Sequence, residues 1–331
     1  MSNQVHAMRG SISAGGGRPT MKDVASRAGV ALKTVSRVVN GEPGVTPETA
    51  RRVQGAIEDL GFRRNESARL LRTGRTATLG FIADTWTDPD QAAVYRGLES
   101  IAREQGYLLF TGSTDRDPDR EERLALAMCA RRVDGLVIIP TPGSHDYLVS
   151  EIEAGVATVF ALRPPELVQA DAVLPDERGG ARAGTAHLIA RGHREIGLLL
   201  AEPGSYRSRQ FRAGYAEAMT AAGIAADPGW AALEPGTLSG APVTAVLCAD
   251  QGLTTAALRA LGDEHNRVAV VGFGDFEFAD LVSPPVSVLK YDPVLIGRTA
   301  GELLIRRVAG EETPPRRIEV PVRLVEHPLT G

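Results

Sequence analysis

The feature that most constrains the fold of this chain is a repeated alternation that begins near residue 77. Short apolar runs of strand length recur, and amphipathic stretches of helical length, such as 91–105 and 254–262, separate most of them. Continuous apolar strands separated by helices are typical of parallel sheets covered on both faces. The runs are TLGFIA (78–83), GYLLFTG (106–112), DGLVIIP (134–140), VATVFAL (156–162), REIGLLLA (194–201), VTAVLCA (243–249) and VAVVGF (268–273). This is too much for one ordinary open sheet, so we expect two doubly wound lobes with a ligand crevice at the carboxyl ends of their strands.

The residues before this alternation follow a helical pattern. TMKD fits a capping box, in which the Thr20 hydroxyl caps an amide and Asp23 stands at the fourth position. We expect a first helix that ends at Gly29, a second over 31–39, and a third that begins at Pro47. Three short helices, the first two joined by a tight turn, outline a small all-α helix-turn-helix head.

The stretch TVSRVVNG, residues 34–41, allows two interpretations. Its final Asn-Gly is typical of a hairpin turn between two strands. Val35, Val38 and Val39, however, stand at i, i+3 and i+4, which is one stripe of a helix. A strand would point Val38 and Val39 to opposite faces, so we prefer the helix. The helix places Arg37 on an exposed face.

The charge of the chain is distributed unevenly. The net charge is −4, but residues 1–76 carry 13 Lys and Arg against 6 Asp and Glu. The remaining residues carry 24 against 35, because the whole chain has 37 basic and 41 acidic residues. A basic N-terminal segment on an acidic body favours a nucleic-acid-binding head joined to a second module.

Several classes of protein are disfavoured. The chain has no apolar run long enough to span a membrane and no signal-peptide core, so we expect no export. Cys129 and Cys248 sit in separate apolar runs and are expected to be buried thiols in a reducing compartment. We expect no enzyme and no cofactor, because no catalytic triad spacing, dinucleotide fingerprint, Walker loop or zinc-protease motif is present. The acidic residues Asp84, Asp88 and Asp90 lack a calcium-type loop, so we expect no metal.

The sequence resembles the lactose-repressor (LacI) family of bacterial transcription regulators. The densest part of the resemblance is MKDVASRAGVALKTVSRVVNG followed by VTPETARRVQGAIEDLGFRRNESARLL. HLIARGHREIGLLL, FRAGYAEAM, VVGFGDFEFAD and SPPVSVLKYD extend it over residues 20–328. The resemblance implies a cytoplasmic, nucleoid-associated repressor, a homodimer or tetramer, that binds pseudo-palindromic operator DNA. An activator that uses the same head is the alternative.

The resemblance also implies an architecture and a mode of control. A hinge helix joins the head to a core that resembles periplasmic binding proteins, and a small effector binds in the cleft between the two core lobes. The chain crosses between the lobes near residues 162, 291 and 322. The expected division is a disordered tail (1–18), the helix-turn-helix domain (19–64), the hinge (65–76), an N-terminal lobe (77–162 with 292–321) and a C-terminal lobe (163–291 with 322–331).

The resemblance assigns DNA-binding roles residue by residue. The implied residues are Leu32, Lys33, Thr34, Ser36, Arg37, Asn40, Ala68, Arg69 and Leu71. Arg37 suits a bidentate contact to guanine, and Leu71 falls where the hinge helix of the family wedges into the minor groove. Thr34 and Ser36 suit phosphate oxygens. Ala31 departs from the family, which commonly has a hydroxyl residue here that caps the second helix.

The effector residues are implied less directly. They are Asp84, Asp90, Arg163, Arg209, Arg212, Asp250 and Asp275. The sugar-anchoring arginine of the family lies three residues before a glycine, where this chain has Phe211, so Arg209 and Arg212 are alternatives. Gly274 stands where the family often has an aspartate that binds sugar hydroxyls. Loss of that acceptor, and similarity of GFGDFEFA to gluconate-responsive members, favour a sugar acid; a neutral sugar is the alternative.

Overall fold

The structure is a computed structural model in which the chain divides into two compact units, one ending at Gly74 and one beginning at Arg75. The sheets, helices and side-chain contacts reported below come from the described residues. These are 19–62, 75–202, 204–227, 229–262, 264, 267–274, 279 and 281–326.

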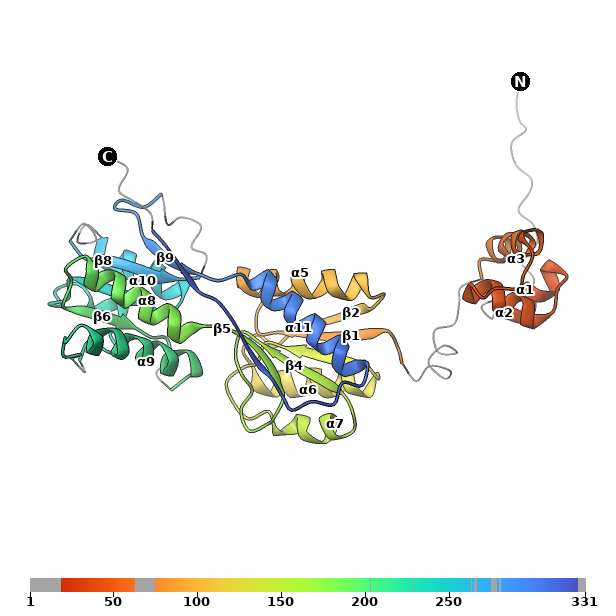
Figure 1. Ribbon diagram of the computed structural model, residues 1–331, viewed down its shortest axis with the longest axis horizontal. Helices are drawn as coiled ribbons and strands as arrows, with labels where there is room; N and C mark the ends of the chain where they lie inside the picture. Colours follow the sequence, from red (N-terminus) through yellow and green to blue (C-terminus); the bar gives the residue numbers. More distant parts are fainter. Residues whose placement is uncertain are drawn as a thin grey trace, which may run out of the picture. The chain divides into compact units, whose positions relative to one another are not determined.

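Within residues 19–62, three helices form the first unit: α1 (Met21–Ala28), α2 (Leu32–Asn40) and α3 (Pro47–Leu60) (Figure 1). The amide of Asp23 donates to the Thr20 hydroxyl at 3.4 Å, and the Thr20 amide donates to the Asp23 carboxylate at 2.7 Å. The predicted capping box is therefore confirmed.

The core of this unit is apolar and draws on all three helices. Its fully buried valines are Val24, Val35 and Val53. Val38 and Val39 pack against this core from α2, so the helical interpretation of residues 34–41 is confirmed and the hairpin is wrong. Gly41 ends the helix in the left-handed conformation (φ 67°), which glycine adopts without a steric penalty.

The second unit contains two sheets. The first sheet is parallel throughout, in the order β10-β5-β4-β3-β1-β2. Its strands are β1 (Thr78–Ala83), β2 (Leu108–Ser113), β3 (Gly135–Ile138), β4 (Ala157–Ala161), β5 (Asp171–Pro175) and β10 (Arg317–Val320). Its helices are α5 (Pro89–Glu104), α6 (Pro118–Ala130), α7 (Val149–Glu153) and α11 (Pro293–Val308), with the 3₁₀ turn η1 (Asp146–Leu148). Helices α5 and α11 cover one face and α6 the other, so this lobe has three layers (Figure 1).

The second sheet has the order β11-β9-β8-β7-β6. Its strands are β6 (Ile196–Leu199), β7 (Ala245–Cys248), β8 (Ala269–Phe273), β9 (Ser287–Lys290) and β11 (Arg323–Val325). All neighbours are parallel except β11, which pairs antiparallel with β9. Its helices are α8 (Glu177–Ala190), α9 (Tyr206–Ala221) and α10 (Gln251–Leu261), with the 3₁₀ turn η2 (Pro235–Thr237). Helices α8 and α9 cover one face and α10 the other.

The expected boundary near residue 162 is wrong. Strand β5 pairs with β4, so it still belongs to the first sheet, and the chain crosses to the second lobe only between Pro175 and Glu177. It returns between Lys290 and Pro293 and crosses again between Val320 and Arg323. The N-terminal lobe therefore extends to about residue 175, and three crossover segments join the lobes (Figure 1). The first and third lie side by side, because the Asp176 amide donates to the Val320 carbonyl at 2.9 Å.

Helices α5 and α11 approach each other with backbone nearly in contact. A Cβ atom at Gly97 of α5 would lie 2.1 Å from the carbonyl oxygen of Val294, and one at Gly297 of α11 would lie 2.0 Å from that of Val94. No side chain fits at such a distance, so glycine at both positions permits this close crossing.

Candidate DNA-reading helix and effector site

Helix α2 presents a polar face opposite its buried valine. The Leu32 side chain is 45% exposed, and Lys33 is also exposed at the first turn. Arg37 lies one turn further along and is half-buried, with a guanidinium nitrogen near Gly44. The first turn of α2 is therefore accessible for contact with another molecule.

Other predicted DNA-binding residues lie on the same helix. Thr34, Ser36 and Asn40 are half-buried, and the Asn40 amide group donates to the Ser36 hydroxyl at 3.3 Å and to the Glu42 carboxylate at 3.1 Å. These bonds hold the end of α2 to the following turn. The remaining predicted residues, Ala68, Arg69 and Leu71, lie outside the described residues.

The start of α2 lacks a side-chain cap. Ala31 occupies the N-cap position in an extended conformation and makes no side-chain hydrogen bond, although its carbonyl accepts from the amides of Thr34 and Val35. The amides at a helix start carry partial positive charge and suit a phosphate oxygen. The α2 terminus therefore offers backbone donors where the family commonly has a hydroxyl.

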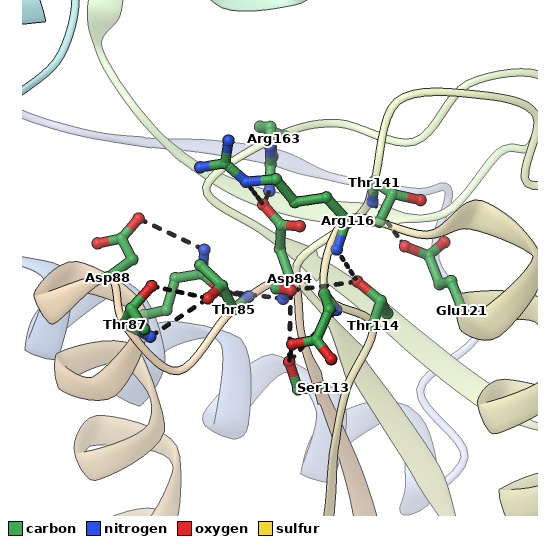
Figure 2. Close-up of polar contacts among 12 residues, drawn as sticks. Asp84, Thr85, Thr87, Asp88, Ser113, Thr114, Arg116, Glu121, Thr141 and Arg163 are labelled. Carbon is green, nitrogen blue, oxygen red and sulfur yellow. Dashed lines mark hydrogen bonds and ion pairs between the residues drawn. The ribbon is translucent and has the colours of Figure 1, made fainter. Parts of the chain in front are cut away.

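In the second unit, a polar cluster gathers at the carboxyl ends of the first sheet. Asp84 follows β1 directly, and its carboxylate accepts from Arg163 at 2.8 Å while Arg116 lies 3.9 Å away (Figure 2). The Asp84 side chain is only 3% exposed, and its Oδ1 atom has no hydrogen-bond partner among the described residues. Of the predicted residues, Asp84 and Arg163 are thus brought together.

The loop after β1 is fixed by backbone bonds. The Gln91 side-chain oxygen accepts from the amides of Asp84 and Thr85, and the hydroxyl of Thr114 donates to the Asp84 carbonyl (Figure 2). Asp88 caps α5 by accepting from the Asp90 amide at 2.9 Å. These bonds hold the backbone that carries Asp84, and the hydrogen bond from Arg163 orients its carboxylate.

Asp90 links the two lobes. Its carboxylate accepts a hydrogen bond from the hydroxyl of Tyr291, which lies on the crossover after β9. The Tyr291 ring lies 5.4 Å from that of Phe273 at the end of β8. Burial raises the pKa of Tyr291 well above its usual value, and the neighbouring Asp90 carboxylate raises it further, so the phenol remains a donor.

The arginine of the C-terminal lobe at this site is Arg207, which the sequence interpretation missed. It lies in the first turn of α9, donates to Glu177 at 2.7 Å and stands over the Phe273 ring at 5.4 Å. Burial acts to lower the pKa of Arg207, but Glu177, Tyr291 and Asp250 raise it overall, so the guanidinium stays protonated. Burial raises the pKa of Glu177, against the opposing effect of Arg207 and Arg163.

The two alternatives named from sequence lie elsewhere on α9. Arg209 is exposed and donates to the Gly204 carbonyl at 2.5 Å. Arg212 is half-buried, and its buried Nε atom has no partner among the described residues. Among the described residues, neither forms a hydrogen bond or an ion pair with Asp84 or Glu177. The helical period could have identified Arg207 from the sequence, because Arg207 stands one turn before Phe211, the position of the family arginine.

Of the two remaining predicted effector residues, the structure describes only Asp250. Asp250 caps α10, accepting from the Leu253 amide at 2.7 Å, and its charge also acts on Arg207. Asp275 lies outside the described residues. Within the described part of the chain, no group of three or more His, Cys, Asp and Glu side chains could hold a metal ion.

These observations define a class of protein: a helix-turn-helix head followed by a two-lobed core with a polar site between its lobes. Residues 20–65 match the model of bacterial regulatory proteins of the lacI family. Residues 76–233 match periplasmic binding proteins and the sugar binding domain of the LacI family, and residues 185–327 match a periplasmic binding protein-like domain. The chain belongs to the LacI family and is a DNA-binding transcriptional regulator.

The relatives span nearly the whole chain. The HTH-type transcriptional regulator CelR of Thermobifida fusca is 34% identical, over 93% of this chain and 97% of its own. PtxS of Pseudomonas aeruginosa, also an HTH-type transcriptional regulator, is 31% identical over 96% and 97%. A solved CelR–cellobiose complex is 30% identical with a TM-score of 0.67, covering 93% of this chain and 99% of that one.

The fold extends to more distant structures. The lac repressor dimer bound to operator and the anti-inducer ONPF superposes with a TM-score of 0.80 at 24% identity, over 95% of this chain and 99% of that one. In the described residues, no helix is long and apolar enough to cross a membrane.

Proposed function

We propose that this regulator is a repressor whose binding to a pseudo-palindromic operator is controlled by a small sugar bound between the core lobes. The observation that carries the proposal is the surface of α2, where Lys33 and Arg37 stand opposite buried Val35 and Leu32 is exposed at the first turn. Relatives named repressors, such as PurR of Haemophilus influenzae at 27% identity, support repression over activation. A repressor acts on the chromosome, so we place it in the cytoplasm, on the nucleoid, without catalytic activity.

The proposed roles follow from side-chain chemistry. Arg37 makes a bidentate contact to guanine O6 and N7, Lys33 donates to a base or phosphate, and Leu32 contacts a thymine methyl. Thr34, Ser36 and the free amides at the start of α2 position the head on phosphates. In the hinge, Leu71 wedges into the minor groove beside Ala68 and Arg69.

We further propose that the protein acts as a homodimer, because a palindrome matches a two-fold symmetric reader. Strand β2 is an edge of the first sheet, and it exposes Leu108 by 70% and Phe110 by 47%. Large apolar side chains on an unpaired edge are a liability in a monomer and suit burial against a second copy.

The proposal is tested by operator selection. Wild-type protein is used to select duplexes from a randomised pool, and affinities are measured by fluorescence anisotropy. Arg37→Met is expected to weaken binding to the selected duplex about 10- to 100-fold, because a bidentate guanine contact contributes about 1–3 kcal/mol.

Binding of Arg37→Met to a scrambled duplex serves as the control and is expected to change little, because phosphate contacts carry no sequence information. Recovery of no common sequence by the wild type, or equal operator affinity of Arg37→Met, would exclude the proposed reading role.

A further inference from the structure

Resting on the proposed function, we infer that the effector is an uncharged sugar held by two carboxylate–arginine pairs, one from each lobe. The first is Asp84–Arg163 in the N-terminal lobe, joined at 2.8 Å. The second is Glu177–Arg207 in the C-terminal lobe, joined at 2.7 Å. Neither member of the second pair was expected at the site from sequence.

In each pair, one carboxylate oxygen accepts no hydrogen bond from the described residues. The Asp84 and Glu177 side chains are 3% and 0% exposed, and within the described residues Oδ1 of Asp84 and Oε2 of Glu177 have no hydrogen-bond partner. A buried carboxylate oxygen without a donor is costly, and native structures rarely leave one. A donor from a ligand accounts for both atoms.

The two pairs belong to one site. Asp90, in the first turn of α5 beside the loop that carries Asp84, accepts a hydrogen bond from Tyr291 on the crossover between the lobes. Arg207 in turn stands over Phe273, whose ring packs against Tyr291. Arg163 and Arg207 keep 29% and 27% of their side chains exposed, so an entering molecule can reach both guanidinium groups.

The structure replaces the acceptor that is missing at Gly274. This residue has φ 93°, a conformation that disfavours a side chain, and a Cβ there would lie 3.6 Å from Oδ2 of Asp90. The Asp90 carboxylate thus lies close to the position that the side chain of an aspartate at residue 274 would occupy first, its Cβ atom. The loss of an aspartate at 274 therefore does not argue for an anionic ligand, because an acceptor comes from the other lobe.

The missing arginine is replaced in the same way. Phe211 is fully buried, with its ring 5.1 Å from that of Phe273, so position 211 now belongs to the apolar core. Arg207, one turn earlier on the same helix, carries the guanidinium instead. Arg207 is therefore the residue that we assign to anchoring the effector.

The charges around the site favour a neutral ligand. Arg163 and Arg207 are each matched by a carboxylate already, and Asp90 and Asp250 add negative charge nearby. A ligand carboxylate would compete with Asp84 and Glu177 for the same guanidinium groups and would be repelled by all four acids. Neighbouring sugar hydroxyls fit each pair, because one hydroxyl donates to the vacant oxygen while the next accepts from the guanidinium.

Calorimetry on the full chain tests the class of ligand. The probes are glucose, galactose, ribose and cellobiose, against gluconate, glucuronate and galacturonate. We expect at least one neutral sugar to bind, and each acid to bind at least 10-fold more weakly than that sugar. Tighter binding of an acid, or the absence of binding by every neutral sugar, would overturn the inference.

Two variants two residues apart test the anchor. Arg207→Met is expected to weaken binding of the neutral sugar about 10- to 100-fold, the range for a lost hydrogen bond to a charged group. Arg209→Met is the matched control and is expected to bind as the wild type does, because the Arg209 side chain is exposed and hydrogen-bonds to the loop carbonyl of Gly204.

Arg207→Met leaves the Glu177 carboxylate buried without its partner, so the fold itself could suffer. The double variant Arg207→Met with Glu177→Gln removes that charge, and its melting temperature shows whether the core is intact. Unchanged sugar affinity in a folded double variant would overturn the anchoring role. Failure of the wild type to select a common operator sequence is a separate result. It would reject the proposed function as a repressor, but it would not affect the inference about the class of sugar.

Discussion

At the scale of single residues, Ala31 is the weakest point of helix α2, the proposed DNA-reading helix. It occupies the N-cap of α2 without a side-chain bond, whereas α1 and α3 are capped by Thr20 and Thr46. Ala31→Ser is expected to stabilise α2 by about 0.5–2 kcal/mol. Hydrogen exchange measured over residues 32–40 should slow accordingly, while Ala31→Val, a poor cap, should not slow it. Equal exchange in the serine variant and the wild type would show that the cap does not limit the helix.

Single residues also show how much of the proposed effector site could be predicted from the sequence. Asp84 and Arg163 were predictable because each follows a strand whose apolar run is plain, and strand ends meet at one edge of a sheet. Arg207 was not, because its role depends on Phe211 turning inward onto Phe273. Glu177 was hidden by the misplaced lobe boundary. A replacement that comes from another turn or another lobe is visible only in three dimensions.

At the scale of elements, the crossing of α5 and α11 holds the N-terminal lobe together. Gly97→Ala places a methyl group against the Val294 carbonyl, which as backbone cannot move aside cheaply. We expect a loss of about 1–3 kcal/mol in the free energy of unfolding. Denaturant titration followed by the fluorescence of Trp86 and Trp230, both in the second unit, measures it.

The contrasting variant is Gly55→Ala on α3, where a Cβ meets nothing within 4 Å. It should leave that tryptophan transition unchanged and stabilise the head by up to about 1 kcal/mol, the propensity difference between the two residues. Equal stability of the Gly97→Ala variant and the wild type would mean that the helices can separate without cost.

Elements with long apolar runs were predictable, and short or polar ones were not. Strand β1 was placed correctly to the residue, because all six of its residues are buried. Strand β5 (DAVLP) begins with an aspartate and ends with a proline, and its Asp171 is satisfied by Arg307 from another element. Strand β10 (RIEV) lies at the sheet edge, and only its last residue is buried. Burial and pairing that depend on distant residues leave little signal in a local window.

At the scale of the whole molecule, the three crossovers explain why each lobe is discontinuous in sequence. Helix α11 and strand β10 return to the first sheet after the second is nearly complete, and β11 then closes the second sheet. Tyr291 and Glu177 lie on or beside these crossovers and contact Asp90 and Arg207. A ligand between the lobes would therefore contact the crossover segments. These segments must move when the angle between the lobes changes, which is how an effector-controlled switch works.

The proposed palindromic operator calls for two copies of the chain, and the exposed edge of β2 makes a specific prediction about the proposed dimer. Leu108→Lys with Phe110→Lys should convert a dimer into a monomer, because two charges replace apolar side chains at the proposed interface. Sedimentation velocity measures the state of association, and operator affinity should fall with it, since each head alone reads one half-site. Leu167→Lys, a loop residue 80% exposed, is the control and should leave the dimer intact. A double variant that still sediments as a dimer would place the interface elsewhere.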